Sequence, residues 1–221
     1  MKTITFRVIL KNTTEMLPYD YYNKMHGYIC KLLGNDFYGK DYRNYVYSNI
    51  CNGRCTKQGF KFVDNPYFYV RVDSEKLRGV FYKNIVRIPI ILGRNKFYVE
   101  GIEVNEEDLS EKIYFDTDAA SPIIAPKKFK GDYLSIDDLK ICEESFVAQV
   151  KRRGNEMDID IDPTLSIEVV KQRPHRDILM HGIINKGRNL LLKISANDET
   201  KKFIMDNGIG RSTSCGFGFL K

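Results

Sequence analysis

The first half of the chain changes between two hydrophobic periodicities. Residues 3–10 alternate polar and apolar positions, which predicts a half-buried strand. Pro18 can occupy a first helical turn, apolar residues then recur at helical spacing from Tyr22 to Leu33, and Gly34 predicts the end of this helix. Beyond it the pattern predicts strands at 45–50, 60–63 and 67–72, a helix from Ser74 to Ile85, and a hairpin formed by 86–92 and 96–104. The order β-α-β-β-α-β is that of a ferredoxin-like domain.

The second half repeats this order of elements with negligible sequence identity to the first. A strand interrupted by Pro122 is predicted over 112–124, and Ser135 caps a predicted helix that runs to about Arg153. Further strands are predicted at 165–171, 178–184, 189–194 and 217–220, and a short helix at 201–206. We therefore predict an α+β fold of two tandem ferredoxin-like (RRM-like) βαββαβ domains, residues 1–108 and 109–221, the second with a C-terminal Gly-rich loop at 207–218.

The charge of the chain changes this picture only where it clusters. The formal net charge of +6 is compatible with solubility alone. Between residues 38 and 61, however, five basic residues and one acidic residue are interleaved with tyrosines, among them Tyr45 and Tyr47. Aromatic faces beside cations suit single-stranded RNA, so Arg54 and Lys57 are candidate RNA contacts. A solvated pair of strands with tyrosines at its edge is the open alternative.

Cysteine usage and hydropathy indicate the compartment. Five scattered cysteines, no secretory signal pattern and no apolar run of about 20 residues predict a reduced cytoplasmic location without a membrane span. Cys51 and Cys55 have the spacing of half a metal site, but no second Cys/His pair follows at a usable distance. We therefore predict no metal and no cofactor.

The last fifteen residues, NGIGRSTSCGFGFLK, are the most informative stretch. Glycine permits positive φ and close approach of the backbone, and free N–H groups beside a basic side chain suit an anion. The stretch lacks the Lys of a P-loop, and Thr213 stands where a dinucleotide fingerprint needs its third glycine. Its Gly-Phe-Gly-Phe run mimics the RNA-recognition octamer but lies at a chain end instead of mid-sheet. The phosphate chain of RNA is the predicted ligand.

Three segments of the chain carry a resemblance to a known family. A ferredoxin-like tandem that ends in G-x-G-x-x-x-S-x-G-F-G, beginning at Gly208, resembles the repeat-associated RAMP superfamily, and within it the CRISPR-associated endoribonucleases that cut precursor CRISPR RNA in its repeats. Met25-His26-Gly27 in the first predicted helix resembles an aliphatic-His-Gly step of some members. The strand at 45–48, Tyr-Val-Tyr-Ser, resembles the aromatic strand that follows the family's active-site loop.

The resemblance implies a metal-independent reaction. In those enzymes a base draws the proton from a ribose 2′-OH, the oxygen attacks the adjacent phosphate, and an acid protonates the leaving 5′ oxygen, which gives a 2′,3′-cyclic phosphate and a mature guide RNA. Such chemistry needs an acid and a base with pKa values near neutrality and a cation for the phosphate. The stretch that matches the family's usual loop histidine, residues 41–43, contains none. His26 is therefore the first catalytic candidate, assisted by Tyr42 and by Arg43 or Lys40.

The remaining candidate site residues are predicted to bind RNA. The strand and turn cations would line an RNA duplex, and the hydroxyl residues of the Gly-rich loop would donate to its backbone; the full set is Tyr28, Lys31, Arg54, Lys57, Arg173, His175, Arg176, Lys186, Arg188, Gly208, Gly210, Arg211, Ser212, Thr213, Ser214, Gly216 and Gly218. The predicted partner is CRISPR repeat RNA, with other effector-complex subunits as further partners of a monomer or homodimer. The alternative is a catalytically weak or inactive RNA-binding protein that acts as a scaffold subunit of a CRISPR effector complex. A nucleotide-binding regulatory module is a more distant alternative.

Overall fold

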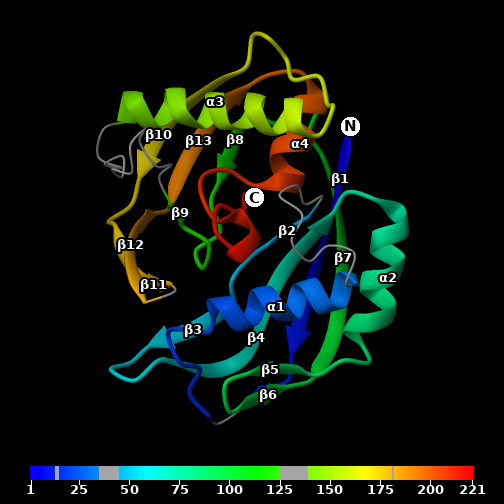
Figure 1. Cartoon of the computed structure of the whole chain (residues 1–221), viewed down its shortest axis with the longest axis vertical. Helices are drawn as coiled ribbons and strands as arrows, with labels where there is room; N and C mark the ends of the chain where they lie inside the picture. Colours follow the sequence, from blue (N-terminus) through cyan, green and yellow to red (C-terminus); the bar gives the residue numbers. More distant parts are fainter. Residues whose placement is uncertain (13–14, 35–44, 125–138, 181) are drawn as a thin grey trace.

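The computed structural model describes the chain except for residues 13–14, 35–44, 125–138 and 181 (Figure 1). Its helices are α1 (Tyr22–Leu33), α2 (Glu75–Ile85), α3 (Leu139–Glu156) and α4 (Asp198–Asn207), with a 3₁₀ turn η2 (Thr213–Cys215). Its strands are β1 (Lys2–Leu10), β2 (Tyr45–Tyr47), β3 (Cys51–Cys55), β4 (Phe60–Val72), β5 (Ile90–Leu92), β6 (Asn95–Phe97), β7 (Val99–Asp108), β8 (Tyr114–Asp116), β9 (Ile123–Ile124), β10 (Ser166–Gln172), β11 (Arg176–Met180), β12 (Ile183–Arg188) and β13 (Leu190–Ser195).

The N-terminal half is an antiparallel sheet covered on one face by two helices. Its strand order is β2-β4-β1-β7, and β3 also pairs with β4. α1 and α2 lie side by side across this sheet (Figure 1). The hairpin β5–β6 is inserted between α2 and β7. This strand order confirms the ferredoxin-like arrangement predicted for the first half.

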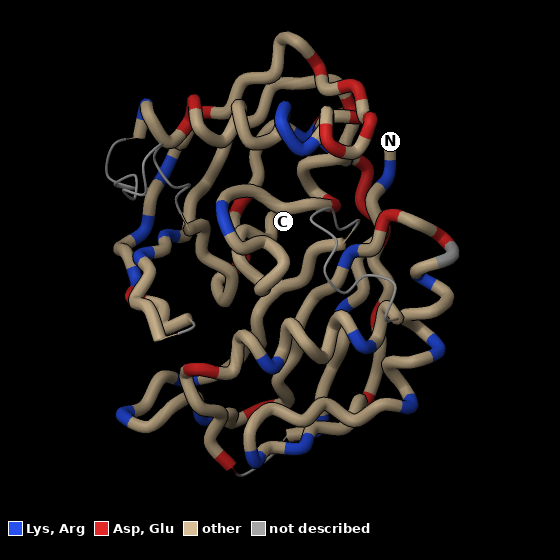
Figure 2. Tube along the Cα trace, in the orientation of Figure 1, with Lys and Arg blue, Asp and Glu red and all other residues tan. Residues whose placement is uncertain are grey.

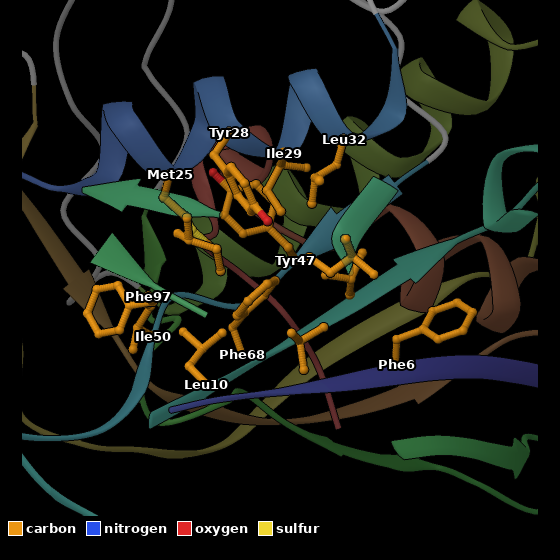
Figure 3. Packing of buried hydrophobic residues seen from close by; sticks show 14 of the residues in the cluster. Phe6, Leu10, Met25, Tyr28, Ile29, Leu32, Tyr47, Ile50, Phe68 and Phe97 are labelled. Carbon is orange, nitrogen blue, oxygen red and sulfur yellow. The ribbon is translucent and has the colours of Figure 1, made fainter. Parts of the chain in front are cut away.

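The alternating pattern of the strands and the helical spacing of α1 meet in one core (Figure 3). Val8 on β1 and Phe68 on β4 are fully buried, and they belong to the same cluster of apolar side chains as Met25 and Ile29 of α1. The helix ends where predicted, because Gly34 adopts a φ of 97° that other residues rarely take. Burying each large apolar side chain stabilises the fold by about 1.5–3 kcal/mol relative to exposure.

The C-terminal half has its own core and a second small sheet. Strands β10-β13-β8 form the main sheet, α3 packs against β10, and the separate sheet β11-β12-β9 projects beside it (Figure 1). Its cluster of buried apolar residues extends from Leu109 to Leu220, whereas that of the first half ends at Phe97. The α+β class and the ferredoxin-like fold are thus confirmed, and the domain boundary at 108/109 stays a prediction.

Three predicted strands of this half differ in the structure. The segment 112–124 is divided between β8 and β9 in different sheets, since Pro122 has no N–H to continue a ladder. The segment 178–184 is a hairpin of β11 and β12, and Gly182 in its turn has a φ of 73°. The final strand is reduced to a bridge between Thr117 and Leu220. The predicted cap Ser135 lies outside the described residues.

A buried arginine connects the two halves. Arg71 on β4 is 2% exposed, and its Nε donates to Thr5 Oγ1 at 2.8 Å. Its Nη1 donates to the carbonyl oxygens of Met205 (3.2 Å) and Leu220 (2.8 Å), which flank residues 207–218, the Gly-rich segment. Burial lowers its pKa to about 10, partly offset by attraction to Asp206, so the guanidinium stays charged at neutral pH. Arg71 therefore fixes the position of the last fifteen residues on the N-terminal sheet.

Candidate functional site

The centre of the candidate site is a contact between α1 and the Gly-rich segment. His26, half-buried on α1, places Nδ1 2.5 Å from the carbonyl oxygen of Ser214, the middle residue of η2. One turn earlier on α1, the ring of Tyr22 packs on Phe217 with 5.1 Å between centroids. Because a carbonyl oxygen only accepts, Nδ1 carries the hydrogen, and in the neutral ring Nε2 carries the lone pair. His26 is thus oriented as an imidazole whose Nε2 can accept a proton.

Cys30 packs beside this imidazole. Its sulfur is 3.6 Å from Nε2 and 4.0 Å from Nδ1 of His26, and 3.5 Å from the hydroxyl of Tyr45. A sulfur in line with the Nε2 lone pair would be much farther from Nδ1 than from Nε2. The near-equal distances therefore leave the lone-pair direction of Nε2 unoccupied by the thiol.

The four glycines of the C-terminal segment are buried against the protein. A Cβ on Gly216 would lie 2.5 Å from Oδ1 of Asn49, and one on Gly218 would lie 1.8 Å from the carbonyl oxygen of Ile209. A Cβ on Gly210 would lie 2.6 Å and one on Gly208 2.9 Å from its nearest neighbour, and all four glycines have positive φ. Packing within the chain accounts for these glycines, and their predicted contact with RNA stays a prediction. The partly exposed residues 211–215 offer the accessible surface of this segment.

Two residues of α3 that the sequence analysis did not single out shape the same segment. Arg153 donates to the carbonyl oxygens of Gly208 and Gly210, both at 3.1 Å, and to Thr213 Oγ1 at 3.2 Å. Gln149 exchanges two hydrogen bonds with the backbone of Gly210, at 2.8 and 2.9 Å. Burial lowers the pKa of Arg153 to about 10, which leaves it charged at neutral pH. In the sequence, the one feature that could have identified Gln149 and Arg153 was their position on the apolar side of the predicted helix.

Replacing Arg153 by methionine is expected to destabilise the protein by about 1–3 kcal/mol, because buried carbonyl oxygens lose their donor. Arg152 is the matched control: its side chain is 69% exposed and makes one surface ion pair with Glu156. Arg152→Met should change stability by less than about 0.5 kcal/mol. Urea unfolding of both variants measures the difference, and equal stabilities would contradict the structural role given to Arg153.

Gly27 sits in mid-helix next to His26, and a Cβ there would meet no atom within 4 Å. The Gly-rich segment therefore does not require a glycine at this position. Gly27→Ala should stabilise the protein by up to about 1 kcal/mol, as expected for Gly to Ala in a helix interior. Thermal unfolding tests this expectation, and a lower midpoint would show that the open space is needed for folding.

The structure corrects part of the predicted RNA-binding set. Tyr28 is 7% exposed, its hydroxyl donates to the carbonyl oxygen of Ile88 at 2.9 Å, and it belongs to the core, so it is not placed to contact RNA. Tyr45 and Tyr47 are buried too and offer no face for stacking. Lys40, Tyr42 and Arg43 lie outside the described residues, so their roles stay predictions.

The predicted cations fall into three places. Lys31 is exposed on α1, and Arg54 and Lys57 are exposed at the β3–β4 hairpin. The others lie on or beside strands β10 to β12, where His175 and Lys186 are exposed. Arg173 pairs with Asp116, and Arg176 donates to Ala119 and Asn189. Arg188 donates to Gln172, and Arg211 on the Gly-rich segment donates to Asn185. The structure does not bring the three places together into one cluster.

A groove separates the β3–β4 hairpin from the β11–β12 arm. Its volume is about 530 Å³, and it is lined by aromatic side chains and by polar ones of both halves, namely Tyr19, Tyr21, Tyr22, Phe60, Tyr67, Asn52, Asp118, Arg176, Asp177 and Lys221. Burial raises the pKa of Tyr22 to about 12, so its hydroxyl is protonated at neutral pH. Aromatic walls suit unpaired bases, and the two cations of the lining are balanced by the two carboxylates of Asp118 and Asp177.

Cys51 and Cys55 do not act as a pair. The thiol of buried Cys51 lies 3.3 Å from Asp118 Oδ1 and donates to it, whereas Cys55 is exposed. Within the described ranges, no three His, Cys, Asp or Glu side chains gather as a metal site would require. No helix in the described part of the chain is long and apolar enough to cross a membrane.

Two tandem ferredoxin-like units, the second ending in a glycine-rich turn packed on the first helix, define a RAMP-type protein. The C-terminal sequence model of the CRISPR-associated protein Cas6 family matches residues 103–221, more than half of the chain. The chain therefore belongs to the Cas6 family, which confirms the resemblance seen in its sequence.

Known proteins agree with this assignment. The chain is 27% identical over 175 residues to a Pyrococcus furiosus protein named "Putative CRISPR-associated endoribonuclease-like protein Cas6", covering 75% of this chain and 71% of the relative. A Pyrococcus horikoshii protein, "Putative CRISPR-associated endoribonuclease-like protein Cas6nc", is 26% identical over 72% of this chain and 69% of its own. A solved structure described as "An RAMP protein binding different RNA substrates" has a TM-score of 0.81 at 18% identity, covering 100% of this chain and 99% of the other, which shows the shared fold.

Proposed function

We propose that this protein is a metal-independent endoribonuclease that binds CRISPR repeat RNA and cuts it by attack of a ribose 2′-OH, leaving a 2′,3′-cyclic phosphate. Family membership supports the class of activity. The observation that carries the chemistry is the contact between His26 Nδ1 and the Ser214 carbonyl oxygen. It orients a titratable group between the first helix and the Gly-rich segment that the sequence links to phosphate.

His26 acts as the general base in this proposal. With Nδ1–H held by Ser214, Nε2 takes the proton of the 2′-OH, and the 2′ oxygen then attacks the adjacent phosphorus. The bond from phosphorus to the 5′ oxygen breaks, and that oxygen takes a proton from the acid, for which Tyr42 is proposed. Arg43 or Lys40 stabilises the extra negative charge on the phosphate in the transition state.

The same RNA extends into the groove between the two halves. The rings of Tyr67 and Phe60 line it, and Arg176 and Lys221 lie in its wall beside the carboxylates of Asp118 and Asp177. Lys221 is held in place by Asp118, 2.5 Å away. Stacking on aromatic faces contributes about 1–3 kcal/mol per base, so a few unpaired nucleotides would bind here firmly. The exposed part of residues 211–215 adds hydroxyl donors between the groove and His26.

A cleavage assay on a labelled repeat RNA in excess EDTA tests the proposal. The wild-type protein should produce one internal cut and retain activity in EDTA. Tight binding without any product would contradict it and would favour an RNA-binding scaffold subunit. Lys140→Ala, an exposed substitution on α3, serves as the control for handling of the protein and should cut like the wild type.

A further inference from the structure

The elements on the helical side of the N-terminal half carry charge of one sign. Residues 21–34 contain two lysines and residues 76–99 contain six Lys and Arg, and neither range contains Asp or Glu. These ranges form α1, α2 after its first residue, and the hairpin β5–β6. Figure 2 shows blue along these elements and no red on them beyond the start of α2. In contrast, α3 carries Glu143, Glu144 and Glu156 among its cations.

Six of these cations form what we call the basic helical face: Lys24, Lys31, Lys83, Arg87, Arg94 and Lys96. All six side chains are exposed. Among the described residues none of the six makes an ion pair, whereas cations elsewhere, such as Lys2 and Arg7, pair with carboxylates. Unpaired cations of one sign repel one another, which favours an anionic partner.

The elements of this face are joined side by side. Asn84 of α2 donates to the carbonyl oxygen of Leu32 at 2.8 Å, at the C-terminal end of α1. On the other side, Lys24 Nζ lies 3.6 Å from the position of a Cβ on Gly93, in the β5–β6 turn. The face is therefore one surface, and its α1 edge begins at the helix that carries His26.

Aromatic side chains accompany the cations. Tyr82 on α2 is 53% exposed and Tyr98, next to β6, is 54% exposed. Lys96 Nζ lies 5.1 Å from the centroid of the Tyr98 ring. Exposed rings beside unpaired cations are the combination that binds single-stranded nucleic acid, through stacking and phosphate contacts.

We infer that the basic helical face binds a single-stranded RNA segment continuous with the strand held at His26. This inference rests on the proposed function and adds a second RNA path, separate from the groove between the halves. The RNA leaving His26 crosses α1 over the open space at Gly27 and passes Lys31 or Lys24. It then follows α2 and the β5–β6 hairpin.

The test is the salt dependence of binding to a long oligouridylate, measured by fluorescence anisotropy. Removing one cation that neutralises a phosphate lowers the slope of log K against log salt by about 0.7 for a single strand. Lys83→Gln/Arg87→Gln and, separately, Arg94→Gln/Lys96→Gln should each weaken binding and reduce the slope by up to ~1.4. The control Lys140→Gln/Arg152→Gln on α3 makes the same change in charge and should keep the wild-type slope.

Thermal unfolding of all three double variants verifies that these exposed substitutions leave the fold intact. Equal slopes for the wild type and both face variants would overturn the inference and would leave the face to a partner other than RNA. The binding measurement requires no cleavage. Failure of the proposed enzymatic function, seen as no product from repeat RNA, is therefore distinguishable from failure of this inference.

Discussion

Replacing His26 by alanine is expected to slow single-turnover cleavage of repeat RNA by about 10²–10⁴-fold, the contribution of a positioned general base. RNA affinity should change by less than about threefold, because the substitution removes one side chain from a large binding surface. The measurement is single-turnover cleavage at saturating protein, combined with a binding titration on the same RNA. A variant that cuts within a few-fold of the wild type would remove His26 from the reaction.

His26→Asn separates catalysis from a structural role. An asparagine amide reaches close to the position of Nδ1 and can donate to the Ser214 carbonyl oxygen, but it has no group at Nε2 and no basic nitrogen. If His26 is the base, the asparagine variant should be as stable as the wild type and as slow as the alanine variant. If its role is only to join α1 to the Gly-rich segment, the asparagine variant should restore most of the cleavage rate.

Gly218→Ala is expected to destabilise the protein by about 3–5 kcal/mol, the range of severe single substitutions. Gly218 has a φ of 68°, and an added Cβ would lie 1.8 Å from the carbonyl oxygen of Ile209, a backbone atom that cannot rotate away. The backbone of the Gly-rich segment would have to move, and with it the Ser214 carbonyl that orients His26. Chemical denaturation and the cleavage assay should both report the loss.

Gly182→Ala is the matched control for that substitution. Gly182 has nearly the same positive φ, 73°, but nothing lies within 4 Å of its added Cβ. It should lose only the about 1–2 kcal/mol that a left-handed residue costs. Equal losses for both variants would mean that backbone conformation, and not the contact with Ile209, explains the need for glycine at 218.

The sequence allowed most of the fold to be predicted where a periodic pattern met a clear stop. The spacing from Tyr22 to Leu33 and the following glycine predicted the body and the last residue of α1. The first helical turn expected at Pro18 is wrong, because the helix begins at Tyr22. The β11–β12 hairpin was missed because 178–184 is continuously rich in apolar residues, and only Gly182 indicated a turn. A run of apolar residues does not tell one strand from two when the turn is tight.

The sequence predicted those parts of the candidate site that lie in a local motif, and it missed those that depend on partners far along the chain. His26 stood within a recognisable step of the first helix, so the sequence singled it out as a candidate, but its contact with the Ser214 carbonyl oxygen was not predicted. Arg71 and Arg153 were missed because hydrophobic patterning treats an arginine as solvent-facing. Both are held by backbone carbonyl oxygens from distant parts of the chain, and no local pattern encodes such partners.

A repeat RNA with a single 2′-deoxyribose at the scissile nucleotide tests the central claim most directly. In EDTA the wild-type protein should cut the all-ribose RNA, leave a 2′,3′-cyclic phosphate on the upstream fragment, and bind the deoxy-substituted RNA equally well without cutting it. Removal of the attacking hydroxyl leaves His26 no proton to take. Cleavage of the deoxy-substituted RNA at the same position would contradict the 2′-OH mechanism and the role of His26 in it.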